Sequence, residues 1–204
     1  MRKLLIITSS SILALSACGK SSPNSPARNV GAPLLEELAP ASWADAAGRF
    51  VSADGADVGH VVLTNAPGAG VLMRVDLQGL SEGWHAIHLH KVGDCSDYTQ
   101  GFNVSGGHVD PDDRPHGLLN IYGPERADMP NIYAGADGRA TAELFNGAVA
   151  LFPSEAATAA AGPHPLLDDD GFAIIVHAGA DDHTTQPIGG AGERVACAAV
   201  KGIV

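Results

Sequence analysis

The chain has 204 residues, including 25 glycines and 13 prolines, and a formal net charge of −11 at pH 7. This length allows one domain with a sizeable hydrophobic core. The negative charge argues against a nucleic-acid partner, because nucleic-acid binding needs clustered lysine and arginine. An anionic substrate would need a local positive site, because the overall field repels it. Few aromatic residues and many glycines and prolines favour a β-protein with long loops.

Residues 1–18 have the pattern of a bacterial export signal. Residues 1–3 are basic at two positions, and residues 4–15 are apolar but too few to span a membrane. Leu15-Ser16-Ala17-Cys18 resembles the lipobox, in which cleavage leaves Cys18 as the lipid-modified N-terminus. An ordinary secretory signal cut nearby is the alternative. Both interpretations export the protein to the cell envelope or periplasm, and the lipid would anchor it to a membrane. Residues 19–42, rich in Ser, Pro and Ala, are typical of a flexible tether.

Residues 43–204 are predicted to form the folded domain. Short apolar runs recur there, separated by turns that contain glycine, proline or aspartate. The runs predict strands at 44–52, 58–65, 71–77, 83–89, 138–144, 148–152, 172–177 and 195–203. Two long loops, 91–132 and 178–193, carry many metal-ligand residue types, so we expect them to be functional. An Ala-rich insertion at 156–162 could form a short helix. About eight strands without helices between them predict an all-β, antiparallel sandwich or barrel.

The stretch from Ala86 to Cys95 contains a His-x-His pair at the end of a predicted strand. Side chains two residues apart on a strand point to the same face, so His88 and His90 share one face. Two imidazoles on one rigid strand make half of a metal site, and imidazole suits zinc, copper, iron and nickel. The alternative is a pair of surface histidines on an amphipathic strand.

Two other histidines lie in recognisable surroundings. His108 lies in Gly106-Gly107-His108-Val109-Asp110-Pro111, and His177 ends the predicted strand at 172–177. Together with the sequences at 86–96 and 189–200, they resemble the bacterial copper/zinc superoxide dismutases over residues 44–202. The resemblance implies a Greek-key fold that dismutates superoxide, a small anion, with copper and zinc as cofactors. It is compatible with a monomer or a homodimer.

The resemblance also assigns roles to single residues. The implied copper ligands are His88, His90, His108 and His177. His108 matches the histidine that bridges copper and zinc as an imidazolate and takes up a proton when the bridge opens. Arg194 matches the catalytic arginine, which would hold the anion and supply the local positive charge. Cys95 and Cys197 match the family's disulfide, which an exported compartment allows.

The zinc side departs from the family pattern. His116 and Asp128 match two zinc ligands, with His108 shared. The position three residues before Asp128 holds Glu125 where the family has a histidine. Zinc accepts carboxylate oxygen, so Glu125 could complete a weakened site; a protein with copper alone is the alternative. Asp181 matches the aspartate that links ligands of the two metals through their outer nitrogens.

Two other function classes are compatible with parts of this sequence. A non-enzymatic envelope protein could use this fold to bind or deliver copper; Arg194 argues against it, while the altered zinc side keeps it open. A zinc hydrolase usually has an acidic residue and another histidine closely following the pair, as in H-x-H-x-D-H, whereas Lys91-Val92-Gly93-Asp94 follows the pair here. The remaining unmatched histidines have no paired neighbours, so we expect surface or structural roles for His60, His85, His164 and His183.

Overall fold

A computed structural model describes residues 44–66, 70–153 and 162–202. The predicted signal with Cys18, the predicted tether and most of the predicted helix at 156–162 lie outside these ranges. Within them, no helix has the length and apolar character needed to cross a membrane. The prediction of an all-β protein is confirmed. The elements are β1 (Ala46–Ser52), β2 (Asp57–Ala66), β3 (Gly70–Leu77), β4 (Gly83–His85), β5 (Ile87–His90), η2 (Tyr98–Gln100), η3 (Asn103–Ser105), β6 (Ile132–Ala134), β7 (Ala140–Asn146), β8 (Val149–Ala150), β9 (His164–Pro165), β10 (Phe172–His177) and β11 (Arg194–Val200).

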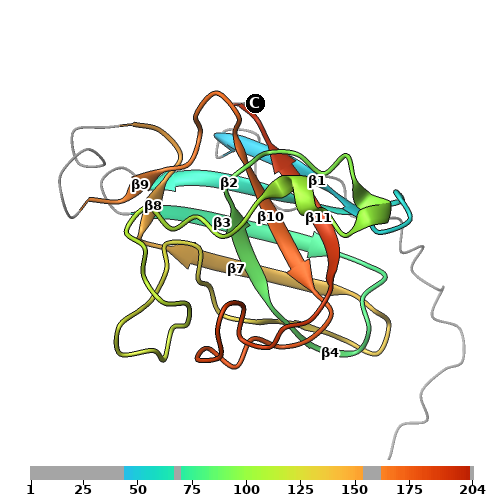
Figure 1. Ribbon diagram of the computed structural model, residues 1–204. Helices are drawn as coiled ribbons and strands as arrows, with labels where there is room; N and C mark the ends of the chain where they lie inside the picture. The colour runs from blue at the N-terminus through green and yellow to red at the C-terminus, as the bar shows by residue number, and fades with distance from the viewer. Residues whose placement is uncertain (1–43, 67–69, 154–161, 203–204) are drawn as a thin grey trace, which may run out of the picture. The chain divides into compact units, whose positions relative to one another are not determined.

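Seven strands form one antiparallel sheet in the order β5-β10-β11-β1-β2-β3-β7. The chain passes from β5 at one edge to β7 at the other, as the Greek-key prediction requires. In Figure 1, the arrows of β10 and β11 cross in front of β2, β3 and β7, because the sheet curls towards a half-barrel. Two small sheets complete the fold, an antiparallel pair of β4 with β6 and a parallel pair of β8 with β9.

One predicted strand, 83–89, is two strands in the structure. β4 pairs with β6, whereas β5 pairs with β10. The exchange of partners occurs at Ala86, whose N–H donates to the carbonyl of Gly179 at 2.8 Å and whose carbonyl accepts from the N–H of His177 at 2.9 Å. A periodic apolar run does not reveal such an exchange, because both halves keep the same alternation. The short strands β6 and β9 were not predicted at all.

The part of the sheet formed by β5, β10 and β11 has two buried faces. Ile87, Leu89, Ile174 and Val176 belong to the main hydrophobic core. Residues of the opposite parity face a second, smaller cluster beneath the first long loop. Its buried members are Phe102, Ala173, Ile175 and Cys197. His88 and His90 pair with Ile175 and Ala173, so they lie on this second face rather than in the main core.

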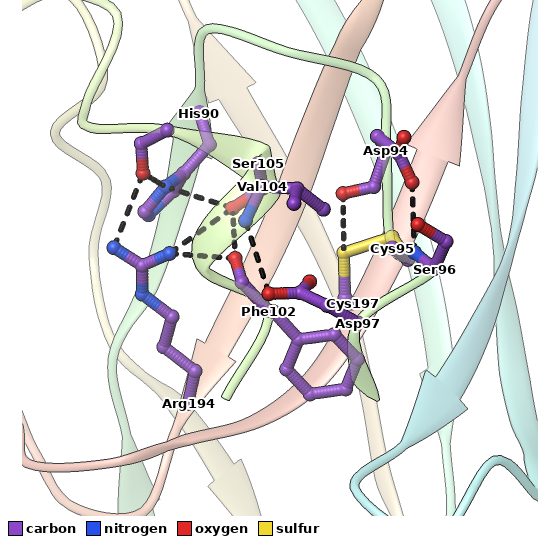
Figure 2. Close-up of a disulfide and its surroundings, with 11 residues drawn as sticks. His90, Asp94, Cys95, Ser96, Asp97, Phe102, Val104, Ser105, Arg194 and Cys197 are labelled. Atoms are coloured by element: carbon purple, nitrogen blue, oxygen red, sulfur yellow. Dashed lines mark hydrogen bonds between the residues drawn. A yellow bond between two sulfur atoms is a disulfide. The ribbon is translucent and has the colours of Figure 1, made fainter. Parts of the chain in front are cut away.

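The predicted disulfide between Cys95 and Cys197 is present, with the two Cα atoms 5.8 Å apart. Cys95 lies in the first long loop, and Cys197 lies on β11 beside β10. The bridge therefore ties the loop to the second face of the sheet, across a sequence separation of 102 residues. Figure 2 shows the bridge close to the turn at Phe102 and Ser105.

Replacing both cysteines, Cys95→Ser with Cys197→Ser, should lower the free energy of unfolding by roughly 2–4 kcal/mol, because the unfolded chain regains loop entropy. Urea unfolding of the metal-free protein measures the change. Wild type kept fully reduced is the matched control and should unfold like the double variant. Equal stabilities of oxidised wild type and the double variant would contradict a stabilising role of the bridge.

Candidate metal centre

β5 places the His-x-His pair in the interior of the protein. His88 and His90 are 0% and 1% exposed, which rules out the alternative of two surface histidines. β10 lies beside β5 and ends at His177, which is equally buried. His108 arrives from the first long loop and forms an isolated β-bridge with His90. The structure therefore brings together all four histidines that the sequence predicts as copper ligands.

Each of these four histidines has one buried ring nitrogen for which the described residues provide no hydrogen-bond partner. These atoms are His88 Nδ1, His90 Nε2, His108 Nε2 and His177 Nε2. Nitrogens of three of the rings, those of His88, His108 and His177, lie within 4.8 Å of one another. The ring of His90 lies further out, 5.1 Å from the His108 ring between centroids. Buried nitrogens without partners are costly unless a ligand satisfies them, so the set fits a copper ion.

The other nitrogen of each strand histidine is held by the protein. His90 Nδ1 lies 2.8 Å from the Gly106 carbonyl, and His177 Nδ1 lies 2.9 Å from the Gly192 carbonyl. A carbonyl only accepts, so both Nδ1 atoms carry the proton and both Nε2 atoms are free to bind metal. Burial lowers the pKa of His90 well below its usual value and that of His177 to about 4. Both rings are therefore neutral at pH 7.

Beside this set lies a second group that contains two histidines and two carboxylates. The ligand atoms of His108, His116, Glu125 and Asp128 lie within 4.8 Å of one another. His108 Nδ1 is 2.5 Å from Glu125 Oε2, and His116 Nδ1 is 2.6 Å from Asp128 Oδ1. Two imidazole nitrogens and two carboxylate oxygens suit a four-coordinate zinc ion. Glu125 thus occupies the place where the family pattern has a histidine.

His108 belongs to both groups. Its Nε2 is the unpartnered atom on the copper side, and its Nδ1 contacts Glu125 on the zinc side. One ring therefore has a nitrogen directed to each group, as a bridging imidazolate requires. Its ring centroid lies 4.4 Å from that of His88 and 5.3 Å from that of His116.

The carboxylates of the second group strongly affect its histidine. Burial by itself would lower the pKa of His116, but hydrogen bonds to Asp128, Asp181 and Glu125 raise it to about 11. Burial would raise the pKa of Glu125, but hydrogen bonds from His108 and His116 lower it to about 2. In the metal-free protein the ring of His116 is therefore a cation between carboxylates, at the place where a divalent cation would bind.

Asp181 connects the two groups from behind. Its Oδ2 lies 2.9 Å from His88 Nε2, and its Oδ1 lies 3.1 Å from His116 Nε2. These are the ring nitrogens that face away from the two metal groups. The Asp181 side chain is 0% exposed, and burial would raise its pKa, but the hydrogen bonds from His116 and His88 lower it below its usual value. Asp181 is thus an ionised acceptor that orients one histidine of each group.

Arg194 reaches the metal face because of a β-bulge. Strand β11 pairs Ala196 with Val176 and then Arg194 with His177, so Val195 is the extra residue. Val195 packs against the main core, and Arg194 shares the side of His177 instead. Its guanidinium donates to the Phe102 carbonyl at 2.8 Å, to Ser105 Oγ at 3.1 Å and to the Gly106 carbonyl at 3.1 Å (Figure 2).

Sequence reasoning missed several residues that support the site. Ser105 is completely buried and contacts both Arg194 and His90. Asn131 holds the backbone of Asp181 through its side-chain amide, at 2.8 and 2.9 Å. No spacing pattern marks such residues, because each contact joins distant parts of the chain.

The remaining histidines lie outside the metal-ligand groups among the described residues. His85 is buried, with one ring nitrogen 2.7 Å from the carbonyl of His177 and the other 2.9 Å from that of Ser81. His183 lies beside Asp181, which its backbone N–H contacts at 2.6 Å. His60 and His164 lie on β2 and β9.

Comparisons with known proteins agree with this geometry. The family model for copper/zinc superoxide dismutase (SODC) matches residues 58–200. A Cu-Zn superoxide dismutase of Caulobacter vibrioides is 50% identical over 149 residues, which cover 72% of this chain and 80% of that protein. A superoxide dismutase-like protein of Bacillus subtilis is 27% identical over 203 residues, covering 99% and 97% of the two chains. A crystal structure of a double mutant of a SOD-like protein from Bacillus subtilis superposes with a TM-score of 0.69 at 29% identity, covering 76% of this chain and 97% of that chain.

Fold and site together define a β-sandwich metalloprotein with two adjacent metal groups that share one histidine. The family-model match over residues 58–200 and the 50% identity to the Caulobacter protein identify the family of this metalloprotein. The chain belongs to the copper/zinc superoxide dismutase family.

Gly189 lies against Asp181, where a larger residue would displace its carboxylate. A substitution there tests whether Asp181 supports both metal groups through His88 and His116. A Cβ at Gly189 would lie 1.6 Å from Asp181 Oδ1, and the backbone φ there is +61°. Gly189→Ala should displace the carboxylate and weaken zinc binding about 10- to 100-fold. Zinc competition with a chromogenic chelator measures the affinity.

Gly190→Ala is the matched control, because its φ is +67° but nothing lies within 4 Å of the added Cβ. It carries the same backbone strain without the clash. An equal loss of zinc affinity in both variants would show that strain rather than displacement of Asp181 is responsible.

Proposed function

We propose that this protein dismutates superoxide at a copper ion bound by His88, His90, His108 and His177. The observation that carries the proposal is the set of four buried ring nitrogens without partners, beside a fixed guanidinium. Copper, when bound, supplies one-electron redox chemistry, by which two superoxide ions and two protons become one dioxygen and one hydrogen peroxide. The remaining tasks are to attract the anion, orient it and deliver protons, and they fall to the protein.

Arg194 is proposed to attract and orient the anion. The chain carries a net charge of −11, so an anion needs a local cation near the metal. Three acceptors hold the guanidinium beside His90 and His177, and an arginine fork keeps its charge at any physiological pH. Such a fixed donor stabilises an anion without reorganisation. A protein that only stores or delivers copper has no need of this arrangement.

His108 is proposed to hold and deliver a proton. It has one nitrogen on each side of the centre, Nε2 towards the copper group and Nδ1 towards the zinc group. Nε2, the atom that would bind copper, is also the atom that could hold a proton, and the contact of Nδ1 with Glu125 would keep the ring in place. The proton is then available at Nε2 for the peroxide product.

Two substitutions test the copper site and the anion site separately. His177→Ala should abolish superoxide dismutation, because it removes a copper ligand. Arg194→Ala should lower the rate constant about 10-fold while copper stays bound, and it should weaken the dependence of the rate on salt. Pulse-radiolysis decay of superoxide with copper-loaded protein measures both effects.

Arg194→Lys is the matched variant for Arg194→Ala, because it keeps the charge but loses the planar fork. It should recover part of the rate. An unchanged rate and salt dependence in Arg194→Ala would contradict the proposal that Arg194 attracts and orients the anion. Copper-loaded wild type that fails to accelerate superoxide decay would favour a copper-delivery protein.

Glu125 is proposed as the fourth zinc ligand. Its oxygen lies 2.5 Å from His108 Nδ1 and 3.1 Å from His116 Nδ1, within the group that contains Asp128. Its backbone N–H also donates to Asp128 Oδ2 at 2.9 Å, so both carboxylates are held in the same turn. Two imidazoles and two carboxylates offer zinc four ligands, and zinc binding weakens in acid because all four must stay deprotonated.

Glu125→Gln should weaken zinc binding about 10- to 100-fold, with a smaller effect on copper, and Glu125→His should tighten it. The metal-free His116, with a pKa of about 11, is protonated at pH 7, so zinc must displace that proton. Zinc binding should therefore release protons and weaken as the pH falls. Calorimetry in buffers of different ionisation enthalpy counts the protons.

Glu82→Gln, a change of an exposed glutamate, is the matched control and should leave zinc binding unchanged. Equal zinc affinities of wild type and Glu125→Gln would remove Glu125 from the site.

We further propose that the domain of residues 43–204 is exported to the cell envelope and held there by a lipid on Cys18. The support is the basic start and apolar run of residues 1–18, the lipobox at Leu15-Ser16-Ala17-Cys18, and the composition of 19–42. The disulfide between Cys95 and Cys197 fits an oxidising compartment. The lipid would hold the domain at the membrane on a flexible tether.

Wild-type protein expressed with its own leader should partition into the detergent phase, whereas Cys18→Ala should lose this partitioning together with the lipid. Detergent phase separation and mass spectrometry of the N-terminus measure both properties. Cys18→Ser tests whether the loss depends on the thiol. A water-soluble wild type with an unmodified N-terminus would contradict the lipid anchor.

A further inference from the structure

Ser105 lies between the proposed anion-binding arginine and a proposed copper ligand. It ends the short helix η3 and is 0% exposed. Its Oγ lies 2.8 Å from the carbonyl of Phe102, 3.1 Å from Arg194 Nη1 and 3.3 Å from His90 Nδ1. Figure 2 shows the hydroxyl between the guanidinium and the turn at Phe102. The hydroxyl has only one hydrogen, so it can donate to only one of these three neighbours.

The Ser105 hydroxyl donates to the Phe102 carbonyl and accepts from Arg194. The Phe102 carbonyl only accepts, so the Ser105 hydroxyl donates its hydrogen to it. The oxygen lone pairs are then directed to donors, and Arg194 Nη1 is such a donor. His90 Nδ1 already donates to the Gly106 carbonyl at 2.8 Å, so its contact with Ser105 is the weaker one. The hydroxyl therefore serves chiefly as an acceptor for Arg194.

Three of the five N–H donors of Arg194 are used by this turn, one of them by Ser105. The Nη1 atom has two hydrogens, and the Phe102 carbonyl and Ser105 Oγ take one each. The Gly106 carbonyl takes one hydrogen of Nη2. The Nε hydrogen and the second Nη2 hydrogen find no acceptor among the described residues, so two of five donors remain for an anion.

The backbone geometry of this turn is unusual and is held by packing. Phe102 has a left-handed φ of 56°, and its buried side chain packs with Cys197 and Ile175 in the second cluster. The turn thus presents one hydroxyl and two carbonyls to a single guanidinium. The Gly106 carbonyl accepts from both His90 and Arg194, which links the copper group to the arginine.

We infer that Ser105 is a positioning residue, whose hydroxyl fixes the orientation of the Arg194 guanidinium for binding the substrate anion. The inference rests on the proposed role of Arg194. Without the hydroxyl, one Nη1 hydrogen loses its acceptor in a partly buried place, and the two remaining carbonyl contacts hold the fork less tightly. The two donors left for the anion are then less well oriented.

The test measures the affinity of copper-loaded protein for azide, a small anion, by titration of the visible absorption of Cu(II). Ser105→Ala should weaken azide binding about 3- to 10-fold, the effect of one ordinary hydrogen bond, because the hydroxyl acts on the anion only through Arg194. Ser96→Ala, the same change at an exposed serine of the same loop, should have no effect. Copper affinity, measured by chelator competition, should be unchanged in both variants.

A double-mutant cycle shows whether Ser105 acts through Arg194. Arg194→Ala should weaken azide binding more than Ser105→Ala does, and adding Ser105→Ala to Arg194→Ala should cause no further loss. A further loss of the same size would mean that Ser105 acts through His90 instead, and would overturn the inference. An unchanged azide affinity in Ser105→Ala alone would also overturn it. If Arg194→Ala itself has no effect, the proposed role of Arg194 fails, and the inference fails with it.

Discussion

The metal centre depends on the pairing of β10 with a neighbour on each side. β5 places His88 opposite Ile175, and β11 places Arg194 opposite His177. A strand cannot slip by one residue without turning all its side chains to the other face, and the main core prevents that slip. The apolar residues of β5 and β10 therefore determine where the histidines point. Packing on one face of the sheet creates the geometry for chemistry on the other.

Electrostatics explains why the second group needs a cation. Asp128 and Asp181 are nearly inaccessible to water, and Glu125 is only partly accessible. All three contact the ring of His116, which compensates their charge in the metal-free protein by holding a proton. A divalent cation would compensate the same charge with shorter contacts and would release the proton. Metal binding and protonation are therefore coupled in this group.

The disulfide and the second hydrophobic cluster support both the arginine and the copper-side histidines. The Cys95–Cys197 bridge and the Phe102 side chain fasten the first long loop to β10 and β11. The same loop then presents the carbonyls of Phe102 and Gly106 to Arg194, and the carbonyl of Gly106 to His90. A small apolar cluster thus supports a charged group a few ångströms away. A long loop with little regular secondary structure can therefore hold a guanidinium in one orientation.

The sequence by itself determined the all-β class, most of the long strands, the four copper-side histidines and the disulfide. The class and the strands follow from alternation among neighbouring residues, whereas the histidine set and the disulfide follow from the resemblance to the copper/zinc superoxide dismutases. Only the tertiary structure decided the exchange of partners at Ala86, the bulge at Val195 and the contacts of Ser105. It also placed Glu125 against His108 and His116. These features depend on hydrogen bonds and packing between residues that are distant along the chain, and no local pattern encodes which distant groups will meet.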